Sequence, residues 1–353
     1  MRPARDSGLN PLLALMLCAG AGAAFAALRL PLPWMIGPLL AMATCNFAGA
    51  ELRAPRGGRA LGQVLIGTAL GLYFTPAVGR EVIAHWPLLL LAAALAVLLG
   101  VLGGWILSRV SGVDSTTAFF ASVPGGAAEM TLLGERFRAR PDRVALAQSL
   151  RILVVVIVVP FALTYSGAHG SDSFVSDGLP LRWQGVATLL AIAAAAALLL
   201  DRLGMPNAFM FGPLAVTIGI TVAEVQFSSL PALLTNSAQV LIGCALGARF
   251  ERRSLESAPR YVAGVLASVL MGLALAALVA AAVALLAGLS VPSLVLAMAP
   301  GGIAEMCITA KVLQLGVPLV TAAHVARVLV LIVGTGPGYR AVQVLRAWQR
   351  SAK

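Results

Sequence analysis

Apolar residues fill long segments of this chain, and short polar stretches separate them. Two segments, 82–108 and 261–304, contain no Asp, Glu, Lys or Arg. A helix that crosses a membrane needs about 20 predominantly apolar residues, and the second segment is long enough for more than one passage. The pattern therefore predicts an all-α polytopic membrane protein.

Each half of the chain contains six apolar segments. In the first half they lie near residues 11–28, 34–50, 60–74, 84–108, 114–136 and 144–165. In the second half they lie near residues 184–200, 207–224, 233–250, 261–287, 292–311 and 318–336. The two sets follow each other in the same order, which suggests an internal repeat.

Four sequence blocks occur twice and in the same order. Residues 62–74, GQVLIGTALGLYF, match 238–250, AQVLIGCALGARF, and PGGAAEM at 124–130 matches PGGIAEM at 300–306. The blocks at 30–41 and 144–158 match those at 204–215 and 320–334. From Gln63 onward the copies are separated by a constant 176 positions. The chain is therefore predicted to consist of a first repeat, 1–176, and a second repeat, 177–353.

The distribution of basic residues predicts how the segments cross the membrane, because cytoplasmic loops of membrane proteins are rich in Lys and Arg. If all twelve segments cross, the two sides carry 11 and 12 basic residues. If the two Pro-Gly-Gly segments instead turn back, the sides carry 19 and 4. This bias favours about ten membrane-spanning helices and two re-entrant hairpins. Five spans in each half is an odd number, so the two repeats are expected to be inverted, with both termini in the cytoplasm.

Composition agrees with a membrane protein and excludes other classes. Charged residues make up 11% of the chain, against about 25% in soluble domains. The net charge of +11 lies in short loops, so we expect no nucleic-acid binding. The four cysteines occur singly, without metal-ligand spacing. The first 28 residues resemble a signal peptide, but further spans follow, so we expect a retained first span.

The Pro-Gly-Gly sequences are candidates for a binding site. Proline interrupts a helix, and irregular backbone inside a membrane persists only where protein or water satisfies its polar groups. A helix that starts after the break directs free N–H groups toward it, and such helix ends attract anions. We therefore expect Pro124, Gly125 and Gly126, together with Pro300, Gly301 and Gly302, to bind a substrate carboxylate or another anion.

Two glutamates and two arginines lie inside the apolar segments. Glu129 and Glu305 follow the two breaks, and Arg151 and Arg327 lie in the next segment of each half. Ionisable residues inside a membrane are functional by default. The sequence leaves open whether Glu129–Arg151 and Glu305–Arg327 form pairs within each repeat, form cross-pairs between repeats, or only hold the hairpins in place. If the glutamates are protonated during the cycle, they can carry coupling protons.

Other polar residues occupy matching positions in the two repeats. Gln148 and His324 are equivalent, as are Gln63 and Gln239. All four are candidates for lining the site, although a single histidine on a helix is more often structural. The pairs Gly67/Gly71 and Gly243/Gly247 have the G-xxx-G spacing of closely packed helices.

With these motifs in view, the chain resembles the Gram-negative AbrB-duplication membrane proteins, which carry the labels "AbrB family transcriptional regulator" and "ammonia monooxygenase". The resemblance covers almost the whole chain and rests on LPWMIGPLLA, GQVLIGTALG and PGGAAEM with their second copies. More distantly, the Pro-Gly-Gly turn resembles that of bile-acid/sodium symporters, in the broad cation/proton antiporter and anion transporter superfamily. Those symporters have Ser-Asn where this chain has Glu129-Met130 and Glu305-Met306, so the resemblance does not extend to sodium coupling.

The pattern favours a secondary transporter, because inverted repeats with broken helices near the membrane midplane are typical of that class. We expect an ion- or proton-coupled transporter of a small, anionic solute in the bacterial inner membrane. The alternative is a membrane-embedded regulator or sensor of gene expression, as the family label implies. An enzyme is not expected, because no nucleophile, metal ligand set or cofactor motif is present, and His85, His169 and His324 lack ligand spacing. The expected partners are the lipid bilayer and the solute, and a homodimer is left open.

Overall fold

The computed structural model describes residues 9–168, 170, 181–225, 227–250, 258–331 and 334. All regular secondary structure in these residues is helical, which confirms the all-α prediction. The first half contains α1 (Leu9–Ala27), α2 (Pro33–Phe47), α3 (Gly58–Gly71), α4 (Pro76–Ala84), α5 (Trp86–Ser111), α6 (Ser115–Ser122), α7 (Ala127–Arg136) and α8 (Pro141–Tyr165). The second half contains α9 (Trp183–Arg202), α10 (Ala208–Val222), α11 (Ala232–Gly247), α13 (Pro259–Ala287), α14 (Val291–Met298) and α15 (Ile303–Leu313). A helix at Val317–Leu331, called here the 317–331 helix, completes the described part.

Several of these helices can cross a membrane. Among the described residues, five are long and apolar enough by length and composition: the bulk of α1 together with α5, α8, α9 and α13. A sixth passage is added if α3 and α4, which meet at a bend of 91°, count as one broken span. The helices α10, α11 and 317–331 are apolar but shorter. The protein is therefore a polytopic helical membrane protein, and the count of ten spans stays a prediction.

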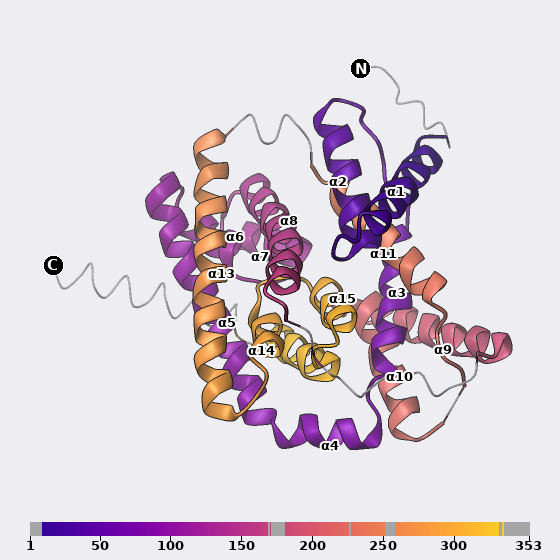
Figure 1. The fold of residues 1–353 in the computed structure, drawn as a ribbon. Coiled ribbons are helices and arrows are strands. Elements are labelled where there is room, and N and C mark those ends of the chain that lie inside the picture. The colour runs from indigo at the N-terminus through magenta and orange to yellow at the C-terminus, as the bar shows by residue number, and fades with distance from the viewer. Residues whose placement is uncertain are drawn as a thin grey trace.

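Helix α4 is an element that the sequence did not lead us to expect. Pro76 stands at its N-terminus, and the Thr75 side chain caps it by accepting a hydrogen bond from the backbone N–H of Val78. Proline is well tolerated in a first helical turn. In Figure 1, α4 lies across the end of the molecule below α5 and α10. The apolar pattern ends at residue 74 and resumes at residue 84, and α4 fills this gap.

Each Pro-Gly-Gly sequence separates two short helices. The first break lies between α6 and α7, and the second lies between α14 and α15. Both α6 and α14 have eight residues, and adding 176 to the bounds of α6 gives those of α14. Because proline supplies no N–H and disfavours the helical conformation in the residue before it, Val123 and Ala299 are extended and end the first arm.

The first broken segment folds back on itself as a hairpin. The backbone N–H of Arg140, which follows α7, donates to the Oγ1 of Thr117 near the start of α6, at 2.9 Å. The rings of Phe120 and Phe137 stack with centroids 5.6 Å apart. The start of α6 and the end of α7 therefore lie at the same end of the hairpin.

The second broken segment has the same shape. A Cβ added to Gly316, which follows α15, would lie 3.3 Å from the Oγ of Ser293 near the start of α14. The two arms of the second hairpin thus also return to one end. How deeply either hairpin enters a membrane stays a prediction.

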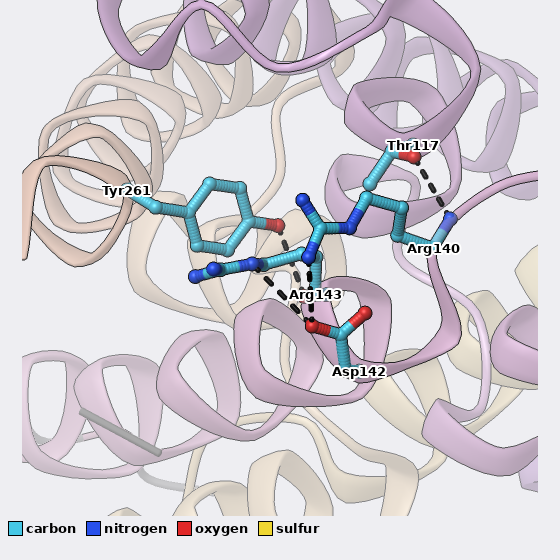
Figure 2. A network of polar contacts seen from close by, with 5 residues as sticks. All are labelled: Thr117, Arg140, Asp142, Arg143 and Tyr261. Atoms are coloured by element: carbon cyan, nitrogen blue, oxygen red, sulfur yellow. Dashed lines mark hydrogen bonds and ion pairs between the residues drawn. The ribbon is translucent and has the colours of Figure 1, made fainter. Parts of the chain in front are cut away.

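A polar network ties the open end of the first hairpin to the second half of the chain (Figure 2). The Tyr261 hydroxyl on α13 donates to the backbone carbonyl of Arg143 at 2.9 Å, and the Arg143 guanidinium lies over the Tyr261 ring, 5.3 Å from its centroid. Asp142 contacts both Arg140 and Arg143 at 3.4 Å. The network fixes the connection between α7 and α8 against α13.

The helices form two bundles (Figure 1). The first, called here the hairpin bundle, contains α5, α6, α7, α8, α13, α14, α15 and the 317–331 helix, and its labelled helices are joined by mutual contacts. The second, called here the glycine bundle, contains α1, α2, α3, α9, α10 and α11, which contact one another in the same way. Helices from both halves of the sequence enter each bundle.

Glycines bring the two halves together in the glycine bundle. A Cβ on Gly67 of α3 would lie 2.7 Å from the carbonyl oxygen of Met210 on α10. A Cβ on Gly243 of α11 would overlap the carbonyl oxygen of Met35 on α2. Each G-xxx-G helix therefore packs against a helix of the other half, and the close packing predicted for these glycines is confirmed.

Equivalent helices of the two halves run antiparallel in the hairpin bundle. At one end of the pair, Arg260 of α13 donates to the carbonyl of Val110 near the end of α5. Farther along, the Ser268 hydroxyl donates to the Gly103 carbonyl at 2.8 Å. An inverted repeat requires this orientation, and the inverted relation of the complete halves stays a prediction.

Candidate functional site

A cavity lies between the two bundles, and both Pro-Gly-Gly breaks line it. The hairpin bundle contributes Pro124, Gly125, Gly126, Ala127, Arg151, Ile152, Gly301, Gly302, Ile303, Ala304, Glu305, Arg327 and Val328, and the glycine bundle contributes Arg59, Gln63, Asn207, Met210 and Ile242. The space open to the centres of water molecules measures about 60 Å³, whereas one water needs only about 10–15 Å³. The cavity is therefore large enough for a few waters or a small solute.

The two buried arginines bind the broken ends of the hairpins. Arg151 donates through Nη1 to the carbonyl of Val123 at 3.0 Å and through Nη2 to that of Gly125 at 3.1 Å. Arg327 donates to the equivalent carbonyls of Ala299 and Gly301, at 2.7 and 2.6 Å. A helix leaves its last carbonyls without partners, and the planar guanidinium reaches two of them at once.

The glycines in PGGxxEM make room for the two side chains that end the motif. A Cβ on Gly125 would lie 2.6 Å from the methyl carbon of Met130, and a Cβ on Gly126 would overlap the carboxylate of Glu129. In the second copy, Gly301 meets Met306 and Gly302 meets Glu305 in the same way. All four glycines have negative φ, so close approach rather than a left-handed turn requires glycine here.

Each glutamate lies at the N-terminus of the second arm of its hairpin. Glu129 and Glu305 are the third residues of α7 and α15, and their carboxylates fold back toward the glycine that precedes the helix. A glutamate at this position commonly completes a helix N-terminus. Glu129 also accepts a hydrogen bond from the Nδ2 of Asn207 at 3.1 Å. Asn207 precedes α10, so this bond joins the hairpin bundle to the glycine bundle.

The glutamates and arginines form neither the pairs within each repeat nor the cross-pairs that the sequence left open. No ion pair joins Glu129 or Glu305 to Arg151 or Arg327 in the described structure. The Nη groups of both arginines donate hydrogen bonds to backbone carbonyls instead. Arg151, Arg327 and Glu305 nevertheless line the same cavity. The charges of the two repeats therefore meet around one cavity.

Gln148 and His324 lie behind the breaks rather than along the cavity. The Nε2 of Gln148 donates to the carbonyls of Phe120 and Val123, at 2.8 and 3.0 Å. His324 is fully buried, and neither of its ring nitrogens has a hydrogen-bond partner within the part of the chain that the structure describes. Gln63 lines the cavity, whereas Gln239 is buried in α11 and is absent from the lining.

Arg59 and Asn207 are cavity residues that the sequence analysis did not select. Arg59 is the second residue of α3, and it is one of the 19 basic residues counted on the cytoplasmic side. Asn207 stands in the second repeat near the position of Leu32, and both precede a helix in the left-handed conformation. A comparison of the two repeats for polar residues present in only one of them would have pointed to Asn207.

The cavity contains three arginines and one glutamate. Positive charge therefore exceeds negative charge when all four are ionised, and the N-termini of α7 and α15 add partial positive charge. This arrangement favours an anion. Among the described residues, no group of three or more His, Cys, Asp or Glu side chains is placed to hold a metal ion.

The fold and this site define the class as a polytopic helical membrane protein with two broken-helix hairpins around a shared polar cavity. The family model described as "Transition state regulatory protein AbrB" matches residues 34–343, which is most of the chain. The protein therefore belongs to the AbrB family.

Two relatives match along nearly their whole length. The chain is 28% identical to "Uncharacterized protein YhjN" of Bacillus subtilis (strain 168), over 98% of this chain and 96% of that protein. It is 25% identical to "Putative regulator AbrB" of Escherichia coli (strain K12), over 99% of this chain and 100% of that protein.

Proposed function

We propose that this protein is a secondary transporter of a small anion, and that it works by movement of the hairpin bundle relative to the glycine bundle. The observation that carries the proposal is the cavity between the bundles, which both Pro-Gly-Gly breaks and both buried arginines line. A site at the boundary of two bundles opens to one side of the membrane or the other as the bundles shift.

The contacts across the boundary support such movement. Most helix pairs with extensive contacts lie within a bundle. Across the boundary α3 contacts α15, and buried apolar side chains of α3 and α8, such as Ile66 and Val156, belong to one core cluster. Asn207–Glu129 and a cation–π contact between Lys311 of α15 and Tyr73, which follows α3, add to it. Contacts of this kind can be exchanged without unfolding either bundle.

The same proposal assigns the chain to the bacterial cytoplasmic membrane, with both termini on the cytoplasmic side. The bias of basic residues toward one set of loops supports this orientation. It also makes the protein a carrier rather than an enzyme. The regulatory role in the names of the family and of the E. coli relative remains the alternative, and this site contains no feature that favours it.

The experiment is flux of small organic acids in proteoliposomes that contain the purified protein. We expect saturable uptake that Arg327→Gln and Glu305→Gln each reduce at least tenfold. Arg202, exposed at the end of α9, provides the control, because Arg202→Gln removes a positive charge from a residue that does not line the cavity and should leave flux unchanged. Equal flux in wild type and in both site variants would contradict the assignment of the site.

A further inference from the structure

The carboxylates of Glu129 and Glu305 occupy the place at each hairpin where an anion is expected to bind. Both belong to the first turn of a helix of at least ten residues, α7 or α15. The Oε2 atom of each lies where a Cβ of the preceding glycine, Gly126 or Gly302, would stand. The carboxylate therefore occupies a space, called here the cradle, that is free only because Gly126 or Gly302 has no Cβ.

The surroundings of this cradle indicate that it accepts a ligand. The residues that begin α7 and α15 line the cavity, as do Arg151 and Arg327. Both arginines are more than nine-tenths buried, with exposed fractions of 4% and 2%, and the Nε of each has no hydrogen-bond partner among the described residues. Buried donors without partners are costly. Both Nε atoms are closed to solvent in this arrangement, so a solute with an acceptor group gains from them only once the guanidinium turns toward the cavity.

We propose that each glutamate carboxylate is a tethered substitute for the transported anion, and that a small carboxylate displaces it from the N-terminus of its helix. The inference rests on the proposed function and specifies its substrate class as small carboxylates. In the resting protein the chain's own carboxylate satisfies the helix end. In the loaded protein the solute takes that place, and the glutamate turns away from the glycine.

The two glutamate carboxylates are not held equally firmly in their cradles. Glu129 accepts a hydrogen bond from Asn207. The Glu305 side chain accepts none from another side chain within the described residues, although it is 96% buried and lines the cavity. A solute should therefore displace Glu305 from its cradle more readily than Glu129.

The competing explanation is that each glutamate only completes its helix, as a capping box does. Both explanations predict that Glu305→Ala lowers the melting temperature of the purified protein in detergent. They differ in what a free carboxylate does to that variant. If the cradle is an anion site, formate or acetate should enter the vacated place and restore stability.

The test is the melting temperature of wild type, Glu305→Ala and Glu129→Ala in titrations of sodium formate and sodium acetate, compared with sodium chloride at equal ionic strength. We expect saturable recovery of at least half of the loss in the alanine variants, and a smaller shift in wild type, whose own carboxylate competes. Glu135→Ala, an exposed position on α7, should show no recovery. Gly302→Ala combined with Glu305→Ala should show none either, because the added Cβ fills the cradle.

The outcomes separate this inference from the proposed function. No saturable recovery in either alanine variant overturns the tethered-anion inference, even if wild type transports anions. Recovery in a protein that moves no anion across a membrane would support the site and contradict the transporter. A variant that does not fold in chloride but folds in formate shows recovery in its strongest form, and one that folds in neither counts against the inference.

Discussion

Arg151 and Arg327 lie 176 residues apart and bind two pairs of carbonyls that are also 176 residues apart, Val123 and Gly125 in one repeat and Ala299 and Gly301 in the other. Each guanidinium bridges a Pro-Gly-Gly break and satisfies carbonyls that the broken helix leaves free. The arginine and the break therefore form one structural unit, and that unit holds open the backbone at which we expect the solute to bind.

This bridging predicts that lysine cannot replace either arginine. A lysine keeps the positive charge but lacks the planar fork that reaches two carbonyls. A hydrogen bond to a charged group contributes about 1.5–3 kcal/mol, so Arg151→Lys and Arg327→Lys, which each lose one such bond, should each lower the free energy of unfolding by about 1.5–3 kcal/mol. Chemical unfolding in detergent measures this. The control is Arg109→Lys, whose guanidinium lies over the Trp105 ring near the end of α5 and should change stability by less than about 1 kcal/mol. Site variants as stable as the control would refute the bridge.

The hydrogen bond between Asn207 and Glu129 is expected to favour the arrangement of the two bundles in this structure over the shifted arrangement that transport requires. Asn207→Leu, which introduces before α10 the residue type that precedes α2, removes the bond, and a loss of about 1.4 kcal/mol would shift the population of this arrangement tenfold. Spin labels at the exposed Leu132 and Leu203, one on each bundle, report the change as a second distance in pulsed electron resonance. The reciprocal Leu32→Asn should not produce it. An unchanged distance distribution in Asn207→Leu would show that the bond does not select the arrangement.

The helix crossings of the glycine bundle predict a contrast between glycines. Gly67→Ala and Gly243→Ala place a Cβ against the backbone of a neighbouring helix and should each cost about 1–3 kcal/mol. Gly219→Ala on α10 is the matched control, because nothing lies within 4 Å of its Cβ. Alanine stabilises a helix by about 0.5–1 kcal/mol relative to glycine, so this variant should melt at a slightly higher temperature. Similar effects at all three positions would contradict the packing.

The network in Figure 2 predicts that Tyr261→Phe loosens the end of the first hairpin. The change removes the hydrogen bond to the Arg143 carbonyl and keeps the ring beneath the guanidinium. We expect a loss of about 1 kcal/mol and faster hydrogen exchange of the amides at 138–144. Exchange that is unchanged there would mean that other contacts hold this connection.

The local features of the fold could be predicted from the sequence. Pro124 and Pro300 fixed where the helices break, because a proline both lacks a donor and disfavours helix in the residue before it. Gly67 and Gly243 indicated close packing through their spacing. The lengths of the apolar segments indicated a polytopic helical protein. Each of these depends on residues that are neighbours in sequence.

The partners of the charged residues could not be predicted in the same way. Backbone carbonyls carry no sequence signature, so nothing distinguished Val123 and Gly125 as acceptors for Arg151. Asn207 is 78 residues from Glu129, and only the packing of α10 from the other repeat brings them together. The sequence shows that Glu129 and Glu305 follow the breaks, but the approach of their carboxylates to Gly126 and Gly302 depends on side-chain conformation.

Arrest of the two bundles by a reversible cross-link tests the account most directly. Cysteines at positions 73 and 311, in a background without the four native cysteines, lie on opposite bundles at a contact between the Lys311 ammonium and the Tyr73 ring. A disulfide-containing bifunctional reagent should abolish flux of the transported carboxylate in proportion to the cross-linked fraction, and reductant should restore it. The same reagent at positions 110 and 260, which face each other within the hairpin bundle, should leave flux intact. Full flux through protein cross-linked between the bundles would contradict transport by their relative movement.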